Sequence, residues 1–190
     1  ITREILDDQI AHAQAIDSSQ YTKNSVSKLT AAIEAAQACN DPAQYTAVYN
    51  ALKAAEAALR TAVPAENGQV DLSGQTADKV GIVVSSSQPL TIEQGKGQAE
   101  AYLELAADQT LPQITAQGTL NGQAVTLAIP AQTAANAETI LLPRAQDTRD
   151  TAVLTALQNK LQSNVTVRQH IQVGGTETIT FDQFVTLTFA

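Results

Sequence analysis

Residues 41–59 read DPAQYTAVYNALKAAEAAL and contain the clearest helix start in the chain. Asp41 stands at an N-cap position, Pro42 follows where its missing N–H costs nothing, and Gln44 falls at the capping-box position. Apolar residues then recur at steps of three and four, which is the spacing of one helix face. They are Tyr45, Val48, Leu52, Ala55 and Leu59. The stretch therefore predicts an amphipathic helix with one buried face.

Two further helices with the same spacing are predicted upstream. The first would bury Leu6, Ile10, Ala13 and Ile16, and the second Val26, Leu29, Ile33 and Ala36. Residues 17–20, DSSQ, separate them with turn-forming side chains, and Thr22 is the expected N-cap of the second helix. Because short loops make neighbouring helices antiparallel, residues 1–63 are predicted to form an up-down-up three-helix bundle.

Composition changes sharply after this region. Residues 1–63 contain 16 of the 33 alanines and no glycine, whereas residues 64–190 contain all nine glycines and five of the six prolines. We therefore expect two domains, 1–63 and 64–190, with residues 63–68 as a polar linker. The first domain has seven acidic and five basic residues, a net charge of -2, and the second has twelve and six, a net charge of -6.

The second domain shows the two-residue alternation of half-buried strands. Strands are expected at 79–85, 98–105, 114–120, 123–129, 165–171, 178–181 and 184–189, with the three phenylalanines in the core. Asn121-Gly122 and Gly174-Gly175 each indicate a hairpin turn. Val153, Leu154, Leu157 and Leu161 behind Thr148 predict one short helix. We predict a mainly antiparallel, β-sandwich-like domain with one short helix.

The overall charge excludes several partners. With 11 basic against 19 acidic residues, the net charge is -8, so we predict no nucleic-acid binding, which depends on clustered Lys and Arg. No apolar run approaches the roughly 18 residues of a membrane span. The chain starts at Ile1 without a signal peptide, and we expect it to be a piece of a longer protein.

No metal site or cofactor is predicted. His12 and His170 lie in different domains, and Cys39 is the only cysteine. We expect His170 to be a surface histidine and Cys39 to be a small buried hydrophobic residue. Asp147 and Asp150 lack the alternating oxygen ligands of a calcium loop and fit the start of a helix.

No catalytic residues are predicted either. Residues 85–87, SSS, have no nucleophile-elbow pattern and are expected to form a polar turn. Residues 95–97, GKG, lack the full phosphate-loop motif and are expected to form a hairpin turn. Glu100 and Glu104 share one strand face and could in principle form a glycosidase pair, but a solvated face is the better interpretation.

An intramolecular isopeptide bond is a further hypothesis, because many adhesin domains carry one. Lys79 near the first strand, Asp182 near the last, and Glu100 or Glu104 between them supply the residue types. Formation of the bond would lower the intact mass by one water. The alternative is that all are ordinary exposed charges.

The helical region resembles a known module. Its apolar spacing and the junction Tyr21-Thr22-x-x-Ser25-Val26 before the second helix are similar to the FIVAR module ("found in various architectures"). The resemblance covers residues 1 to about 63 and implies a three-helix unit of secreted or wall-attached proteins of Gram-positive bacteria. It implies no catalytic residues. Residues 64–190 resemble no family known to us.

These observations favour a non-enzymatic, extracellular module of a bacterial surface protein, attached to the cell wall through other parts of the protein. It would act in adhesion, in binding a glycan, peptidoglycan or host protein, or as a spacer; no binding residues and no oligomeric state are predicted. The alternative is an accessory region of a secreted carbohydrate-active enzyme whose catalytic domain lies elsewhere. The low content of Cys and the absence of Met and Trp fit a secreted protein.

Overall fold

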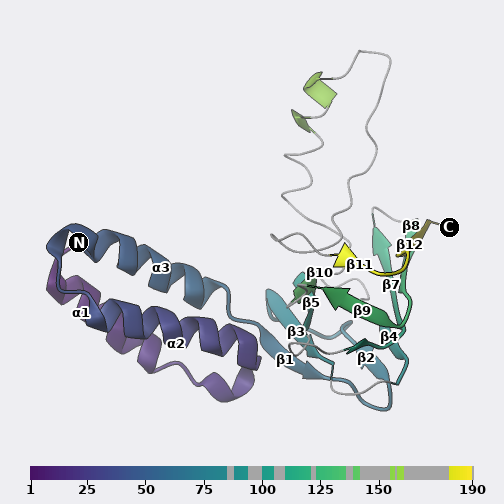
Figure 1. The fold of residues 1–190 in the computed structure, drawn as a ribbon, viewed down its shortest axis with the longest axis horizontal. Coiled ribbons are helices and arrows are strands. Elements are labelled where there is room, and N and C mark those ends of the chain that lie inside the picture. The colour runs from purple at the N-terminus through teal and green to yellow at the C-terminus, as the bar shows by residue number, and fades with distance from the viewer. Residues whose placement is uncertain are drawn as a thin grey trace. The chain divides into compact units, whose positions relative to one another are not determined.

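The computed structural model describes residues 1–84, 88–93, 100–104, 110–120, 123–135, 139–141, 155–156, 158–160 and 180–189. The chain divides into two compact units, Ile1–Ala62 and Val63–Ala190. The first unit contains three helices, and the described part of the second is mainly β (Figure 1). The predicted order, a three-helix bundle followed by a β-sandwich-like region, is confirmed.

The helices are α1 (Arg3–Gln14), α2 (Lys23–Ala38) and α3 (Tyr45–Ala57). Their shared core is formed by Leu6, Ile10, Ala13, Leu29, Ala36, Tyr45 and Leu52, as the apolar spacing predicts. One predicted core residue is wrong: Val26 is only half-buried, and the neighbouring Ser25 occupies the buried position. A hydroxyl takes this position because hydrogen bonds satisfy it there.

Ser25 is the centre of a buried polar network at the start of α2. Its hydroxyl donates to the carbonyl of Thr22 at 3.0 Å, lies 2.9 Å from the Thr22 hydroxyl, and accepts from the backbone N–H of Arg60 at 3.3 Å. The Thr22 N–H donates to the Arg60 carbonyl at 2.9 Å, and Tyr21 forms a β-bridge with Thr61. The Tyr-Thr-x-x-Ser junction thus joins the start of α2 to the chain that leaves α3.

The start of the third helix differs in detail from its prediction. Asp41 is an N-cap, and its carboxylate accepts from the N–H of Ala43 at 3.0 Å. The next residues, Pro42–Gln44, form a 3-10 turn (η2) rather than the first turn of α3. Because α3 begins only at Tyr45, Gln44 stands at its N-cap position and makes no side-chain capping hydrogen bond.

The described strands that follow the helices form two larger sheets and a small one. The four-stranded sheet has the order β1 (Thr61–Pro64), β3 (Lys79–Val83), β5 (Glu100–Glu104), β10 (Thr139–Leu141). The five-stranded sheet has the order β12 (Thr186–Phe189), β8 (Gln123–Ile129), β7 (Ile114–Leu120), β4 (Leu90–Glu93), β2 (Gln69–Asp71). The small sheet has the order β11 (Thr180–Phe181), β9 (Gln132–Ala135), β6 (Thr110–Leu111).

Successive strands from β1 to β5 alternate between the two larger sheets. As a result β3 pairs with β5, β2 with β4, and β4 with β7, all in parallel. A parallel pair needs a long connection, and here the strand in the opposite sheet is part of that connection. The pairs β7–β8, β8–β12 and β5–β10 are antiparallel. The strands β7 and β8 pair as the predicted hairpin requires, and its turn residues Asn121-Gly122 lie outside the described residues.

The core of this unit contains side chains from both larger sheets. Val80, Ile82 and Leu103 come from the four-stranded sheet, and Ile92 and Leu127 from the five-stranded one. A single shared core between two sheets is what defines a sandwich.

Several expectations for this unit were wrong or lie outside the described residues. The expected linker 63–68 is instead the end of β1 and a hairpin turn, and Val63 is buried in the core. The phenylalanines are not all in the core, since Phe184 is 94 % exposed and Phe189 is 47 % exposed. Residues 155–156 and 158–160 are helical, as the predicted short helix requires, whereas its cap Thr148 and the strand 165–171 lie outside the described residues.

Candidate functional site

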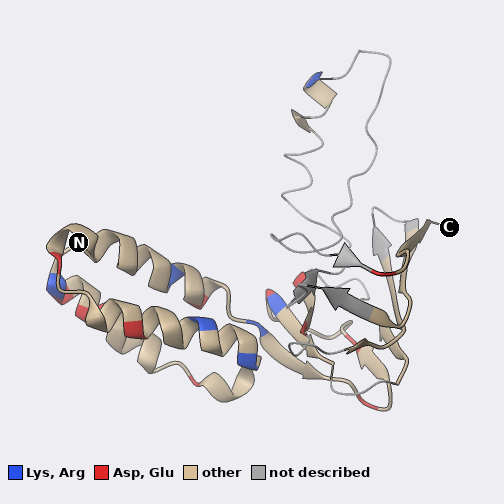
Figure 2. Cartoon of the chain, in the orientation of Figure 1, with Lys and Arg blue, Asp and Glu red and all other residues tan. Residues whose placement is uncertain are grey.

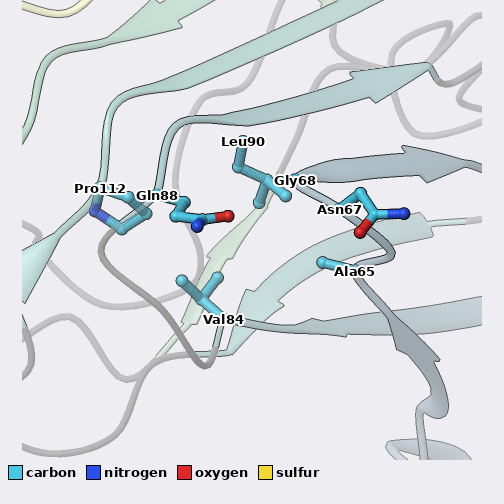
Figure 3. Close-up of a pocket in the computed structure, with 7 residues that line it drawn as sticks. All are labelled: Ala65, Asn67, Gly68, Val84, Gln88, Leu90 and Pro112. Carbon is cyan, nitrogen blue, oxygen red and sulfur yellow. The ribbon is translucent and has the colours of Figure 1, made fainter.

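A pocket of about 240 Å³ opens in the β unit (Figure 3). It lies where the β1–β2 turn approaches the start of β4, and its volume is just below the lower end of the usual range for small-molecule pockets, about 300–1,000 Å³. The residues that line it are Ala65, Asn67, Gly68, Val84, Gln88, Leu90 and Pro112.

A tight turn forms one wall of the pocket. Asn67 and Gly68 have φ values of 50° and 76°, and Glu66 and Gln69 on either side exchange hydrogen bonds of 2.9 and 2.8 Å. Positive φ at both central residues is the signature of a type I′ hairpin turn, which Asn-Gly favours. Asn67-Gly68 is the sequence signal for this hairpin, whereas the change in composition at the same place favours a linker.

The turn is held against β4. The Gly68 carbonyl accepts a hydrogen bond from the N–H of Thr91 at 2.8 Å. A Cβ on Gly68 would lie 2.7 Å from the carbonyl oxygen of Pro89, which is closer than real Cβ contacts. Glycine is therefore required at position 68 both by its φ and by the close approach of the backbone.

The pocket offers hydrogen bonds and apolar contact, and none of the described residues that line it is titratable or nucleophilic. Its side-chain polar groups are the amides of Gln88 and Asn67, each of which has both donor and acceptor atoms. Figure 3 shows the Gln88 side chain between Leu90 and Val84, while Asn67 lies beside the turn backbone. Val84 and Leu90 are buried, so they supply an apolar wall. The arrangement suits a neutral ligand with both polar and apolar groups.

The carboxylates of β5 are buried, which contradicts the solvated face that the alternation of the strand predicts. Glu100 is 9 % and Glu104 is 5 % exposed, and the Tyr102 hydroxyl between them donates to Glu100 at 2.7 Å. Four strand residues at about 3.3 Å each separate their Cα atoms by about 13 Å. Retaining glycosidases need carboxyl groups about 5–5.5 Å apart and inverting ones about 6.5–9.5 Å apart, so the two side chains would have to bend toward each other across Tyr102 to reach such a distance.

The structure brings together only part of the hypothetical isopeptide set. Lys79 is the register partner of Glu100 in the parallel pair β3–β5, which places the two residues on one face of the sheet. Asp182, by contrast, is exposed in the bend after β11, which belongs to the small sheet. The measurement of intact mass remains its direct test.

The other candidate residues do not gather into a site. His12 is on α1, where its Nδ1 lies 3.3 Å from a carboxylate oxygen of Glu56 on α3, and Cys39 is a half-buried C-cap of α2. Within the described ranges, no three His, Cys, Asp or Glu side chains cluster as metal ligands. Residues 85–87 and 95–97, Asp147, Asp150 and His170 lie outside the described residues.

Charge and helix length bear on partners. Acidic and basic side chains are interspersed along the helices of the bundle (Figure 2). Among the described residues, no helix is long and apolar enough to span a bilayer.

No known protein family, no curated protein and no solved structure matches this chain.

Proposed function

We propose that this chain is a non-catalytic module of a bacterial cell-surface protein, and that its β unit binds a small neutral ligand in the pocket beside the Asn67-Gly68 turn. The observation that carries this proposal is the lining of the pocket. The described residues that line it combine two amide side chains with an apolar wall and include no acid, base or nucleophile. These residues support recognition, and they lack the groups that general acid–base or covalent catalysis requires.

The size and polarity of the pocket suggest the ligand class. A volume of about 240 Å³ suits one sugar unit or one side-chain-sized group rather than a long chain. An N-acetylated sugar fits this chemistry, because its amide would exchange hydrogen bonds with Gln88 and Asn67 while its methyl group would contact Val84 and Leu90. Glycans and peptidoglycan fragments carry such sugars, which agrees with a role in adhesion at a cell surface.

The extracellular setting is supported by other features. The chain has one cysteine and no methionine or tryptophan, and its helical unit resembles a module of secreted and wall-attached proteins. In the same setting, the three-helix bundle would act as a spacer between the binding unit and the rest of the protein.

The test is a binding screen of the full chain against N-acetylated sugars, soluble peptidoglycan fragments and host matrix proteins. Gln88→Trp would block the pocket, since Gln88 is exposed at its wall, and Gln117→Trp adds the same bulk at an exposed position of β7 away from it. The proposal predicts saturable binding that Gln88→Trp abolishes and Gln117→Trp retains. Binding that survives Gln88→Trp, or no binding to any member of the panel, would contradict it.

A further inference from the structure

The Asn67-Gly68 turn has the chemical groups for a spontaneous backbone reaction. Asn67 is exposed. A bond between its side-chain carbonyl carbon and the backbone nitrogen of Gly68 would close a five-membered ring. Attack of that nitrogen on the side chain gives a succinimide. Glycine at the following position hinders this attack least, because it has no Cβ.

The backbone torsion ψ of Asn67 decides whether the ring can close. The ring forces the torsion N–C–Cα–Cβ of residue 67 close to zero, which for an L-residue corresponds to ψ near −120°. A type II′ turn has about +60° and −120° for φ and ψ of its first central residue. Asn67 has a φ of 50°, and in a type I′ turn its ψ is about +30°, so rotation of the Asn67–Gly68 peptide plane by about 150° converts the observed turn into the reactive one.

That rotation is compatible with the surrounding structure. Type I′ and type II′ turns both connect hairpin strands, so the flanking residues can keep their positions. Among the described residues, neither the Asn67 carbonyl nor the Gly68 N–H makes a hydrogen bond, so the rotation breaks none there. The bond from Thr91 to the Gly68 carbonyl lies beyond the rotating peptide plane.

We infer that Asn67 is a self-modification site, at which rotation of one peptide plane in an exposed turn brings the Gly68 nitrogen to the side-chain carbonyl carbon and allows a succinimide to form. A bond forms between the Gly68 nitrogen and Cγ of Asn67, the bond from Cγ to the amide nitrogen breaks, and the Gly68 proton leaves with ammonia. Water then adds to one of the two ring carbonyls, which gives aspartate or isoaspartate at position 67. This inference does not rest on the proposed function.

The product would alter the pocket. A carboxylate at position 67 places a negative charge beside lining residues that are uncharged where the structure describes them. Isoaspartate also adds one methylene to the main chain in the turn that packs against Pro89. Modified protein would therefore differ from unmodified protein both in charge and in the shape of the pocket.

The test follows the fully folded chain over time in mildly alkaline buffer. Trypsin releases residues 61–79, in which Asn67 is the only asparagine, so peptide mapping assigns each product to this site. A synthetic peptide of residues 61–79 provides the unstructured reference, and Asn67→Gly provides a control that keeps a residue suited to positive φ but cannot form the ring.

Orientation of reacting groups accelerates ring closure. The folded chain is therefore expected to convert Asn67 at least as fast as the free peptide, by up to about tenfold, with a rate that rises with pH. Asn67→Gly should show no conversion in this peptide. Slower conversion in the folded chain than in the free peptide would overturn the inference, because it would show that the hairpin protects Asn67.

Discussion

Replacement of Gly68 by alanine tests the wall of the pocket, and Gly74→Ala is its matched control. Both glycines are in the β unit, in turns close together in the sequence. A Cβ at position 68 would lie 2.7 Å from the Pro89 carbonyl oxygen, whereas a Cβ at position 74 meets nothing within 4 Å. The pair therefore shares the change in side chain and differs in its structural consequence.

The expected magnitudes follow from two separate costs. Alanine at a φ of 76° pays for the left-handed backbone, about 1–2 kcal/mol. The contact with Pro89 adds the cost of overpacking, about 1–3 kcal/mol. Both variants gain about 0.4–1 kcal/mol from the smaller entropy of the unfolded chain. We expect Gly68→Ala to lower the free energy of unfolding by about 2–4 kcal/mol, and Gly74→Ala to leave it unchanged or to raise it slightly.

The assay is urea denaturation of the full chain followed by a signal of the β unit, such as the NMR methyl resonances of its buried leucines. Separate signals are needed because the bundle and the β unit are two compact units. Equal stability of Gly68→Ala and Gly74→Ala would refute the reasoning, since it would mean that the turn does not approach Pro89 or does not have a positive φ.

Three further outcomes are expected. Ser25→Ala should destabilise the bundle by about 1–3 kcal/mol, because it removes the hydroxyl that accepts the hydrogen bond of the Arg60 N–H. Ser27 is exposed on the same helix, so Ser27→Ala should leave the stability unchanged. Urea denaturation followed by helical circular dichroism would measure the difference in stability between the two variants. Glu56→Ala should cost the bundle about 1–2 kcal/mol in the same assay, because the Glu56 carboxylate accepts from Gln9 at 2.6 Å; a wild-type midpoint would contradict this. Hydrogen bonds from the side chain and backbone of Ser73 lower the pKa of Asp71 in the folded chain. The stabilisation that the ionised Asp71 gives the fold is therefore present above the pKa of the unfolded state, and it is lost as the pH falls through the pKa of the folded state. Ser73→Ala should raise the pKa of Asp71 in an NMR titration, and an unchanged pKa would reject the assignment.

The helical unit could be predicted almost completely because its signals are local. Apolar residues at steps of three and four mark the buried faces, and Asp41-Pro42 marks a helix start. The exception is the Ser25 position, where periodicity favoured Val26. The buried serine hydroxyl is satisfied both by the neighbouring Thr22 and by the backbone N–H of Arg60, which is far away in the sequence.

The sheet arrangement could be predicted only in part, since pairing partners are not encoded locally. A hairpin signal such as Asn121-Gly122 identifies neighbouring antiparallel strands, but it says nothing about a strand whose partner lies one crossover away. The parallel pairing of β3 with β5 depends on β4 joining the other sheet. The same limit explains Glu100 and Glu104, because alternation predicts that they share a face and not whether that face is covered.

The pocket escaped sequence analysis for a related reason. Its residues come from the β1–β2 turn, the end of β3 and the segments before β4 and β7, so only the folded chain brings them together. Asn67-Gly68 was the one local signal, and its value as a hairpin turn was hidden by its position at the change in composition.

The most direct test of a non-catalytic binding pocket is chemical-shift mapping of the full chain with N-acetylglucosamine and soluble peptidoglycan fragments as probes. The account predicts saturable shifts of the Gly68 and Leu90 backbone amides and the Gln88 side-chain amide, with both probes recovered chemically unchanged. Shifts confined to other residues, no shifts at all, or hydrolysis of a probe would contradict it.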